Sequence, residues 1–177
     1  IQSGAKVSVI DEGYDVKVGE SLLGRVIDAM GNPYDGKPMG SLQEAWPLNG
    51  KFLNPMSRNA VDKPLDVGVR AINSLLTVGK GQRLGIIAGS GVGKSVLLGM
   101  MCRYTEAEIV VVGLIGERGR EVGSFVKNLL SGDAKNKTIV VAVPADRSPL
   151  LRIRGANRAT AIAAVSYTHL TLPTISR

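Results

Sequence analysis

The sequence predicts an α/β fold in which a parallel sheet is flanked by helices. Two observations predict it. Residues 109–115 and 138–143 are almost wholly apolar and rich in β-branched side chains, which is typical of central parallel strands covered on both faces. Segments with apolar residues at helical spacing stand between and after these runs. Strands that alternate with helices in this way form parallel sheets joined by right-handed crossovers.

The first part of the chain carries β signals. Residues 1–22 hold two short apolar stretches between glycine and acidic turns, and we interpret them as the end of a small β-structure. Their apolar residues are Val7, Val9, Ile10, Val16 and Val18. Residues 22–28 predict a strand that is closed by a turn at Met-Gly-Asn-Pro, residues 30–33.

A segment rich in proline follows. Residues 31–64 contain five prolines and show little periodicity, so we expect an extended stretch that wraps the domain. Trp46 and Phe52 are its large apolar residues, and we expect both to be packing anchors.

Three further elements lead to the second half of the chain. Residues 66–76 carry apolar side chains at 69, 72, 75 and 76, which predicts a helix. Residues 83–87 form a short apolar run, interpreted as a buried strand. Residues 96–101 predict a mostly buried helix that ends near residue 104 and carries Cys102 as a small buried side chain.

The remaining helices follow the two strongest strands. The first carries Val122, Phe125, Val126, Leu129 and Leu130 on one side, and we expect Gly132 and Asp133 to end it. Residues 148–165 predict the second.

The stretch Ala-Gly-Ser-Gly-Val-Gly-Lys-Ser, residues 88–95, matches a phosphate-binding loop with Ala in the place of the usual first Gly. Its glycines let backbone N–H groups turn toward an anion, and the following helix adds its own unpaired N–H groups and dipole. Lys94 can reach the β- and γ-phosphates, and the Ser95 hydroxyl can bind Mg²⁺. The expected nucleotide-binding residues are Gly89, Ser90, Gly91, Val92, Gly93, Lys94, Ser95 and Val96. A structural glycine-rich turn is the alternative.

A second motif, Gly-Glu-Arg-Gly-Arg-Glu at residues 116–121, follows the strand at 109–115. Ligands of open parallel sheets bind at the carboxyl ends of the strands, so both motifs can face one site. The Glu117 carboxylate there can orient or deprotonate a water for attack on the γ-phosphate, and Arg118 can hold phosphate oxygens. An ordinary charged loop is the alternative. The presence of the phosphate loop in the same chain favours the catalytic interpretation of this motif.

The net charge of +7 resides in the second half. Residues 1–80 contain nine basic and nine acidic residues, whereas residues 81–177 contain thirteen and six. Part of the excess is Arg147, Arg152, Arg154 and Arg158, with no acidic residue after Asp146. These arginines form either a nucleic-acid patch or one face of a helix, and we favour the helix face because few aromatic residues are interleaved.

Several stretches together resemble the flagellar and type III secretion export ATPases, relatives of the catalytic subunit of rotary ATP synthases. The resemblance rests on residues 81–95, on Val-Val-Gly-Leu-Ile-Gly-Glu-Arg-Gly-Arg-Glu-Val at 111–122, and on residues 23–26, 66–73 and 144–151. It extends over about residues 20–160. It implies an ATP hydrolase with ATP and Mg²⁺ as cofactors, working as a homo-hexamer with nucleotide sites between subunits.

The resemblance also implies roles for single residues. Lys94 binds phosphate, Ser95 binds Mg²⁺, Glu117 activates the water, Arg118 contacts the γ-phosphate and Glu121 holds the water shell of the metal. The implied domains are the end of an N-terminal β-barrel at 1–22 and an incomplete P-loop (RecA-like) nucleotide-binding domain at 23–165. The implied partners are stalk and regulator proteins of the export apparatus and its secreted substrates. The implied place is the cytoplasm at the inner membrane, with peripheral membrane association.

The sequence also departs from this family. The strand that ends in a second metal-site Asp, the adenine-stacking aromatic residue and the arginine finger are not found. Residues 166–177 do not continue the family pattern, and we expect them to be a non-native tail that includes the one histidine, His169. We therefore expect the 177-residue chain by itself to be inactive.

Three functions remain open at this stage. The first is an export ATPase of the flagellar or virulence type, favoured by Ser95 and by the Gly-Arg-Glu-Val ending of the second motif. The second is the catalytic subunit of a rotary ATP synthase, which usually has Thr after the Lys. The third is a ring-shaped RNA helicase, supported by the basic second half alone; we expect no specific nucleic-acid partner.

Overall fold

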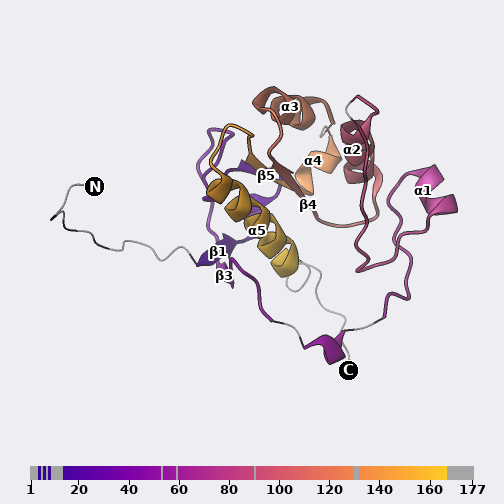
Figure 1. Cartoon of the computed structure of the whole chain (residues 1–177), viewed down its shortest axis with the longest axis horizontal. Coiled ribbons are helices and arrows are strands. Elements are labelled where there is room, and N and C mark those ends of the chain that lie inside the picture. The colour runs from indigo at the N-terminus through magenta and orange to yellow at the C-terminus, as the bar shows by residue number, and fades with distance from the viewer. Residues whose placement is uncertain are drawn as a thin grey trace.

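A three-stranded parallel sheet forms the centre of this computed structural model, which describes residues 4, 6, 8, 14–52, 54–58, 60–89, 91–129 and 132–166 (Figure 1). Strand β5 (Thr138–Val143) lies between β4 (Val110–Ile115) and β2 (Val26–Ile27). The six residues of β4 all pair with β5, from Val110 opposite Thr138 to Ile115 opposite Val143. The two strongest predicted strands are thus confirmed. The expectation that 109–115 is a central strand is wrong for the described sheet, because β5 takes the middle position.

Helices cover both faces of the sheet, which confirms the predicted fold class (Figure 1). Alternate residues of β5 enter two different cores: Ile139 and Val141 pack with α5 (Pro149–Val165), whereas Val140 and Ala142 pack with the other helical layer. That second layer consists of α2 (Lys94–Tyr104), α3 (Gly119–Ser124) and the π-helical turn Phe125–Leu129. All six residues of β5 are buried, so the alternation distributes one strand over both cores.

Helix α5 follows its prediction closely. Ser148 is its N-cap, since the hydroxyl oxygen accepts a hydrogen bond from the Leu151 N–H at 3.4 Å, and Pro149 occupies the first helical position. The arginines predicted to form one helix face do not all do so, because Arg147 precedes α5. Arg158 is buried and donates from Nε to the Ala29 carbonyl at 2.9 Å, which anchors α5 to the turn after β2.

The helix predicted to end at Gly132 and Asp133 is broken into shorter pieces. After α3 the chain forms the π-helical turn 125–129, and a short helix α4 (Asp133–Asn136) begins where an end was expected. Leu130 lies outside the described residues. Gly132 has a φ of 65°, a conformation that favours glycine and separates α4 from the preceding turn.

A two-stranded antiparallel sheet stands beside α5. Strand β1 (Asp15–Val18) pairs with β3 (Glu44–Pro47), and Val16 lies opposite Trp46. The strand signal of Val16 and Val18 is confirmed, whereas β3 was missed because prolines dominate the segment 31–64. Trp46 packs against the core as expected, but Phe52 is 91% exposed and is no packing anchor. Residues 7 and 9–10 lie outside the described part.

Strand β2 is shorter than the predicted strand 22–28, because Leu22 belongs to a 3₁₀ turn at Glu20–Leu22. The predicted turn after β2 is confirmed. The Asp28 carboxylate accepts hydrogen bonds from the N–H groups of Met30 and Asn32 at 2.7 and 2.8 Å. The returning chain donates from Tyr34 N–H to the Val26 carbonyl at 2.8 Å and so covers the outer edge of β2.

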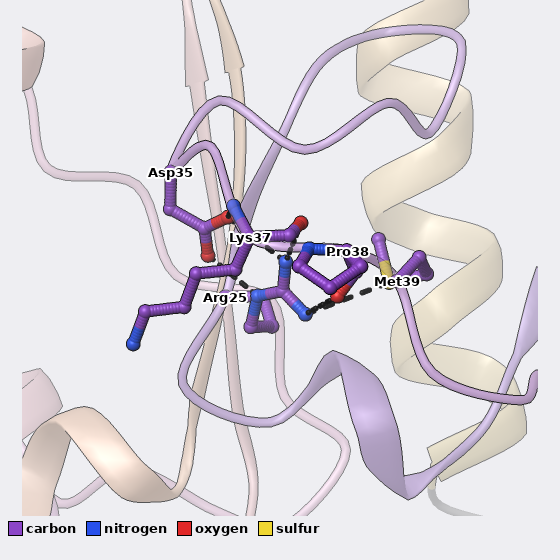
Figure 2. Close-up of polar contacts among 5 residues, drawn as sticks. All are labelled: Arg25, Asp35, Lys37, Pro38 and Met39. Carbon is purple, nitrogen blue, oxygen red and sulfur yellow. Dashed lines mark hydrogen bonds and ion pairs between the residues drawn. The ribbon is translucent and has the colours of Figure 1, made fainter.

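One guanidinium group holds the loop that follows this edge (Figure 2). Arg25 forms a two-pronged ion pair with Asp35, Nε to Oδ2 at 2.5 Å and Nη2 to Oδ1 at 2.8 Å. It also donates to the carbonyls of Lys37 at 2.8 Å and Pro38 at 3.2 Å. The hydrogen bonds from Arg25 lower the pKa of Asp35 to about 2. Residues 35–38 are therefore fixed beside β2 by a single side chain.

Residues 83–87 do not form the predicted buried strand. They run extended without strand pairing in the described structure, and Ile87 is 99% exposed. An apolar run marks a segment that can be buried, but a strand also requires a neighbouring backbone to bond with. The outer edge of β2 is occupied by its own returning chain, and the segment 83–87 does not pair with the outer edge of β4.

Two predicted helices differ in extent or burial. Helix α1 is limited to Arg70–Leu75, since Asp66 ties down the preceding turn by accepting from Gly68 N–H and Asn73 Nδ2, both at 2.6 Å. Of its predicted stripe, Leu75 and Leu76 are exposed. Helix α2 has the expected extent, with Cys102 buried as expected, but it is less buried than predicted because Val96 and Met100 are exposed.

We expect Gly155→Ala in α5 to destabilise the fold by about 1–3 kcal/mol, the usual cost of overpacking. A Cβ at position 155 would overlap the Val143 side chain and lie 3.1 Å from Ile115 Cδ1. Gly123→Ala in α3 is the matched control, because its Cβ would meet no atom within 4 Å, and alanine favours helix by about 1 kcal/mol. Urea unfolding of both variants measures the difference. Equal stabilities would contradict the close approach of α5 to the sheet.

We expect Asp35→Asn to lower the Tm by a few degrees near neutral pH, because the variant removes the ion pair with Arg25. The folded pKa of Asp35 is depressed to about 2, so its stabilising contribution is fully present above its unfolded pKa of about 3.9 and is lost as the pH falls toward 2. Thermal melts from pH 7 to pH 2 measure this, with the exposed Asp62→Asn as control. A wild-type advantage that persists unchanged at pH 2 would refute this role of the pair.

Candidate functional site

The phosphate loop leads directly into α2, and two of its glycines adopt conformations that favour glycine. Gly91 has a φ of 79°, and Gly93, the residue before the helix, has a φ of 95°. No side chain caps the start of α2, so the N–H groups of its first turn remain available to an anion. Lys94 and Ser95 are the first two residues of the helix, and both are exposed; Ser90 lies outside the described residues.

The two sequence motifs line one cavity of about 520 Å³, the phosphate cleft. From the loop and α2 come Gly89, Gly91, Gly93, Lys94, Ser95 and Val96, and from the end of β4 and the start of α3 come Gly116, Glu117, Arg118 and Glu121. The structure thus brings together most of the described residues of both motifs. The motif residues that do not line this cavity are Ala88, Val92, Gly119 and Arg120, and Val92 is 67% exposed. The cleft lies at the carboxyl end of β4, where a parallel sheet presents its ligand sites.

Backbone hydrogen bonds fix the position of Glu117. The Gly116 N–H donates to the Val143 carbonyl at 2.8 Å, and the Ala145 N–H donates to the Glu117 carbonyl at 3.0 Å. The loop after β4 is therefore bonded on both sides to the end of β5. These anchors were missed at the level of sequence, since backbone groups leave no residue-type signal.

Charges of both signs surround the cleft. Lys94 and Arg118 supply positive charge, and Glu117 and Glu121 supply carboxylates. Arg118 Nη1 lies 3.7 Å from Glu121 Oε1, one turn apart on α3, and both side chains are exposed. A pair so exposed is weak, so either side chain can be drawn away by a charged ligand.

The cleft continues into an apolar cavity of about 380 Å³ that shares Lys94, Ser95, Glu117 and Glu121 with it. Its other walls are Leu84, Ile86, Leu98, Leu114, Val122, Ser124 and Phe125. The sequence predicts that the apolar members of this set are core or strand residues. No feature of residue type distinguishes an apolar residue that lines a cavity from one that fills a core.

The donor set suits Mg²⁺. Ser95 offers a hydroxyl, and Glu117 and Glu121 offer carboxylates, in one cavity, and Mg²⁺ prefers such oxygen ligands. Within the described residues no group of three or more His, Cys, Asp or Glu could hold a metal ion. Few protein ligands are typical of Mg²⁺ sites in which substrate phosphates and water complete the shell.

A protein family model matches the part of the chain that contains this site. The family described as "ATP synthase alpha/beta family, nucleotide-binding domain" matches residues 68–168, which is more than half of the chain. The chain belongs to the ATP synthase alpha/beta family. The matched range contains both the phosphate loop and the Gly-Glu-Arg-Gly-Arg-Glu motif. The resemblance identified from the sequence is confirmed.

Two curated relatives in this family are named flagellum-specific ATP synthase. The one from Salmonella typhimurium is 55% identical over 154 residues, 87% of this chain and 34% of the relative. The one from Pseudomonas aeruginosa is 52% identical over 164 residues, 92% of this chain and 36% of the relative. The chain therefore spans about a third of the length of these relatives.

Solved structures of the same family share the fold. A structure described as "a prototypical ATPase from the type III secretion system of pathogenic bacteria" has a TM-score of 0.80 and 45% identity, over 86% of this chain and 44% of that chain. The ATPase EscN of enteropathogenic E. coli, in complex with its central stalk EscO, also has a TM-score of 0.80 and 45% identity, over 86% and 38% of the two chains.

Within the described residues, no helix is long and apolar enough to cross a membrane.

Proposed function

We propose that the protein is the ATPase of a flagellar or type III protein export apparatus, which hydrolyses Mg-ATP to energise protein secretion. The observation that carries the proposal is the phosphate cleft, where a phosphate loop and the carboxylate of Glu117 line one cavity. The names of the similar proteins associate them with the flagellum and with type III secretion, which supports a role in protein export.

The loop and α2 supply the binding groups in this proposal. The backbone N–H groups of residues 89–96 surround the phosphates, and the Lys94 ammonium neutralises charge on the transferred phosphoryl group. The Ser95 hydroxyl and, through water, the Glu121 carboxylate are the groups that would hold Mg²⁺. When bound, the ion would neutralise charge on the β- and γ-phosphates.

The loop after β4 supplies the catalytic groups. Glu117 accepts a hydrogen bond from the attacking water, orients it in line with the γ-phosphate and takes its proton. Arg118 reaches the γ-phosphate oxygens. The two backbone hydrogen bonds to β5 hold the Glu117 backbone still, which keeps the carboxylate aimed at the cleft.

The assembly and the domain limits belong to the same proposal. The full-length protein forms a homo-hexamer at the cytoplasmic face of the inner membrane and associates with that membrane peripherally. Its partners are a stalk protein, regulators and secreted substrates. The similarity to EscN, which was solved with its central stalk, supports the stalk partner. Residues 1–22 end a β-barrel, residues 23–165 form the nucleotide-binding domain and residues 166–177 are a non-native tail. The 177-residue chain alone does not turn over ATP.

Lys94→Ala should abolish ATP turnover in the full-length protein, because the ammonium that neutralises the phosphoryl charge is lost. Steady-state phosphate release with saturating Mg-ATP measures it. Lys127→Ala, an exposed lysine on the π-helical turn, is the control and should retain turnover. Turnover of Lys94→Ala within a few-fold of wild type would sink the proposal.

Glu117→Gln should keep nucleotide affinity within a few-fold while turnover falls by roughly 100-fold or more, since the change preserves size and removes only the carboxylate. Equilibrium binding of a fluorescent ATP analogue, set beside single-turnover hydrolysis, separates the two effects. If binding and turnover fall together, Glu117 is a binding or structural residue instead.

RNA should not stimulate the ATPase, and any RNA binding should fall steeply with salt, because phosphate contacts alone are available to the basic residues. ATPase assays with and without single-stranded RNA, from 50 to 200 mM salt, measure this. Stimulation that survives physiological salt would make an RNA helicase the better assignment.

A further inference from the structure

A second polar cavity of about 220 Å³ lies between α5, β1 and the turn after β2, and we call it the arginine cavity. It shares no lining residue with the phosphate cleft. Among the described residues, Lys17, Arg154 and Arg158 line it together with one carboxylate, Asp15. The cavity therefore carries a surplus of positive charge, two cations of which come from the same helix.

Arg158 is the most deeply placed of these cations, with an exposed fraction of 5%. Its guanidinium lies against the turn after β2. Nε donates to the Ala29 carbonyl at 2.9 Å, and Nη1 lies so near Gly31 that a Cβ there would stand 2.7 Å away. Only one of its five N–H groups is engaged in this way. The four terminal N–H groups have no hydrogen-bond partner within the described part of the chain.

Within the described part of the chain, no carboxylate forms an ion pair with Arg158. Burial and the nearby charge of Arg154 lower its pKa, and Asp28 opposes this shift. The oxygens of Asp28 are already engaged with the N–H groups of Met30 and Asn32 and with the Asn32 amide. A buried cation in such surroundings is stabilised by an anionic group that accepts from its remaining N–H groups.

We propose that the arginine cavity binds a small oxyanion, a phosphate or a carboxylate group, through Arg158, Arg154 and Lys17. The planar guanidinium presents paired N–H groups that match two oxygens of such a group. The cavity has room for a phosphate, whereas it is too small for a nucleotide. Because Arg154 and Arg158 lie on α5 and Lys17 lies on β1, the bound anion would tie the N-terminal strand pair to the nucleotide-binding domain.

The test uses the full-length protein with Lys94→Ala, so that the phosphate loop binds phosphate more weakly. Isothermal titration calorimetry with inorganic phosphate, at constant ionic strength, should show saturable binding. Arg154→Gln should weaken this binding about tenfold, the effect of one charge-assisted hydrogen bond. Lys17→Gln should weaken it less. Lys135→Gln, an exposed lysine on α4 that does not line the cavity, makes the same change in net charge and should leave the affinity within twofold.

A parallel titration with succinate separates the two anion classes, and saturable binding of either that depends on Arg154 supports the proposal. Arg158→Lys keeps the charge and loses the paired N–H groups, so it should also weaken binding. If that variant fails to fold by circular dichroism, the Arg154 and Lys17 variants carry the test. The proposal is overturned if neither anion binds saturably, or if Lys135→Gln weakens binding as much as Arg154→Gln does.

Discussion

The parallel pairing of β4 with β5 is the constraint on which the rest of the structure depends. The six residues of each strand are in register, and β5 is buried along its whole length, so these two strands define the plane against which every covering helix packs. The same register brings the end of β4 beside the end of β5. The position of Glu117 is therefore set by backbone pairing and not by side chains of the cleft. The phosphate loop, which leads into α2, lines the same cavity.

Most of the central architecture could be predicted from the sequence because its signals are local. A few consecutive residues are enough to indicate each of these features: the apolar runs at 110–115 and 138–143, the Ser148 cap with Pro149, and the turn built by Asp28. The cleft was foreseen for a related reason. Each motif was predicted to follow a strand, and in parallel sheets the carboxyl ends of the strands lie together. The two motifs do line one cavity, although residues 83–87 form no strand in the described structure.

The errors concern partners that are distant in the sequence. Residues 83–87 have the composition of a buried strand, yet burial depends on which backbone lies next to them, and composition does not report that. Phe52 and Trp46 are equally apolar, but only Trp46 faces the core, because it sits on a strand that pairs with β1. Arg158 was predicted to lie with the other arginines on one helix face, whereas it is buried and its Nε donates to the Ala29 carbonyl.

The two hydrogen bonds that join the loop after β4 to the end of β5 bear on how such a site can be exchanged between proteins. Residues 116–121 look like a portable hexapeptide, but the carbonyl of Glu117 is held by Ala145, and Ala145 stands three residues before the cap of α5. A transplant of the hexapeptide alone would leave its backbone groups without their acceptor and donor. A functional transfer of this site therefore requires β4 and β5 together with the loop that follows each strand.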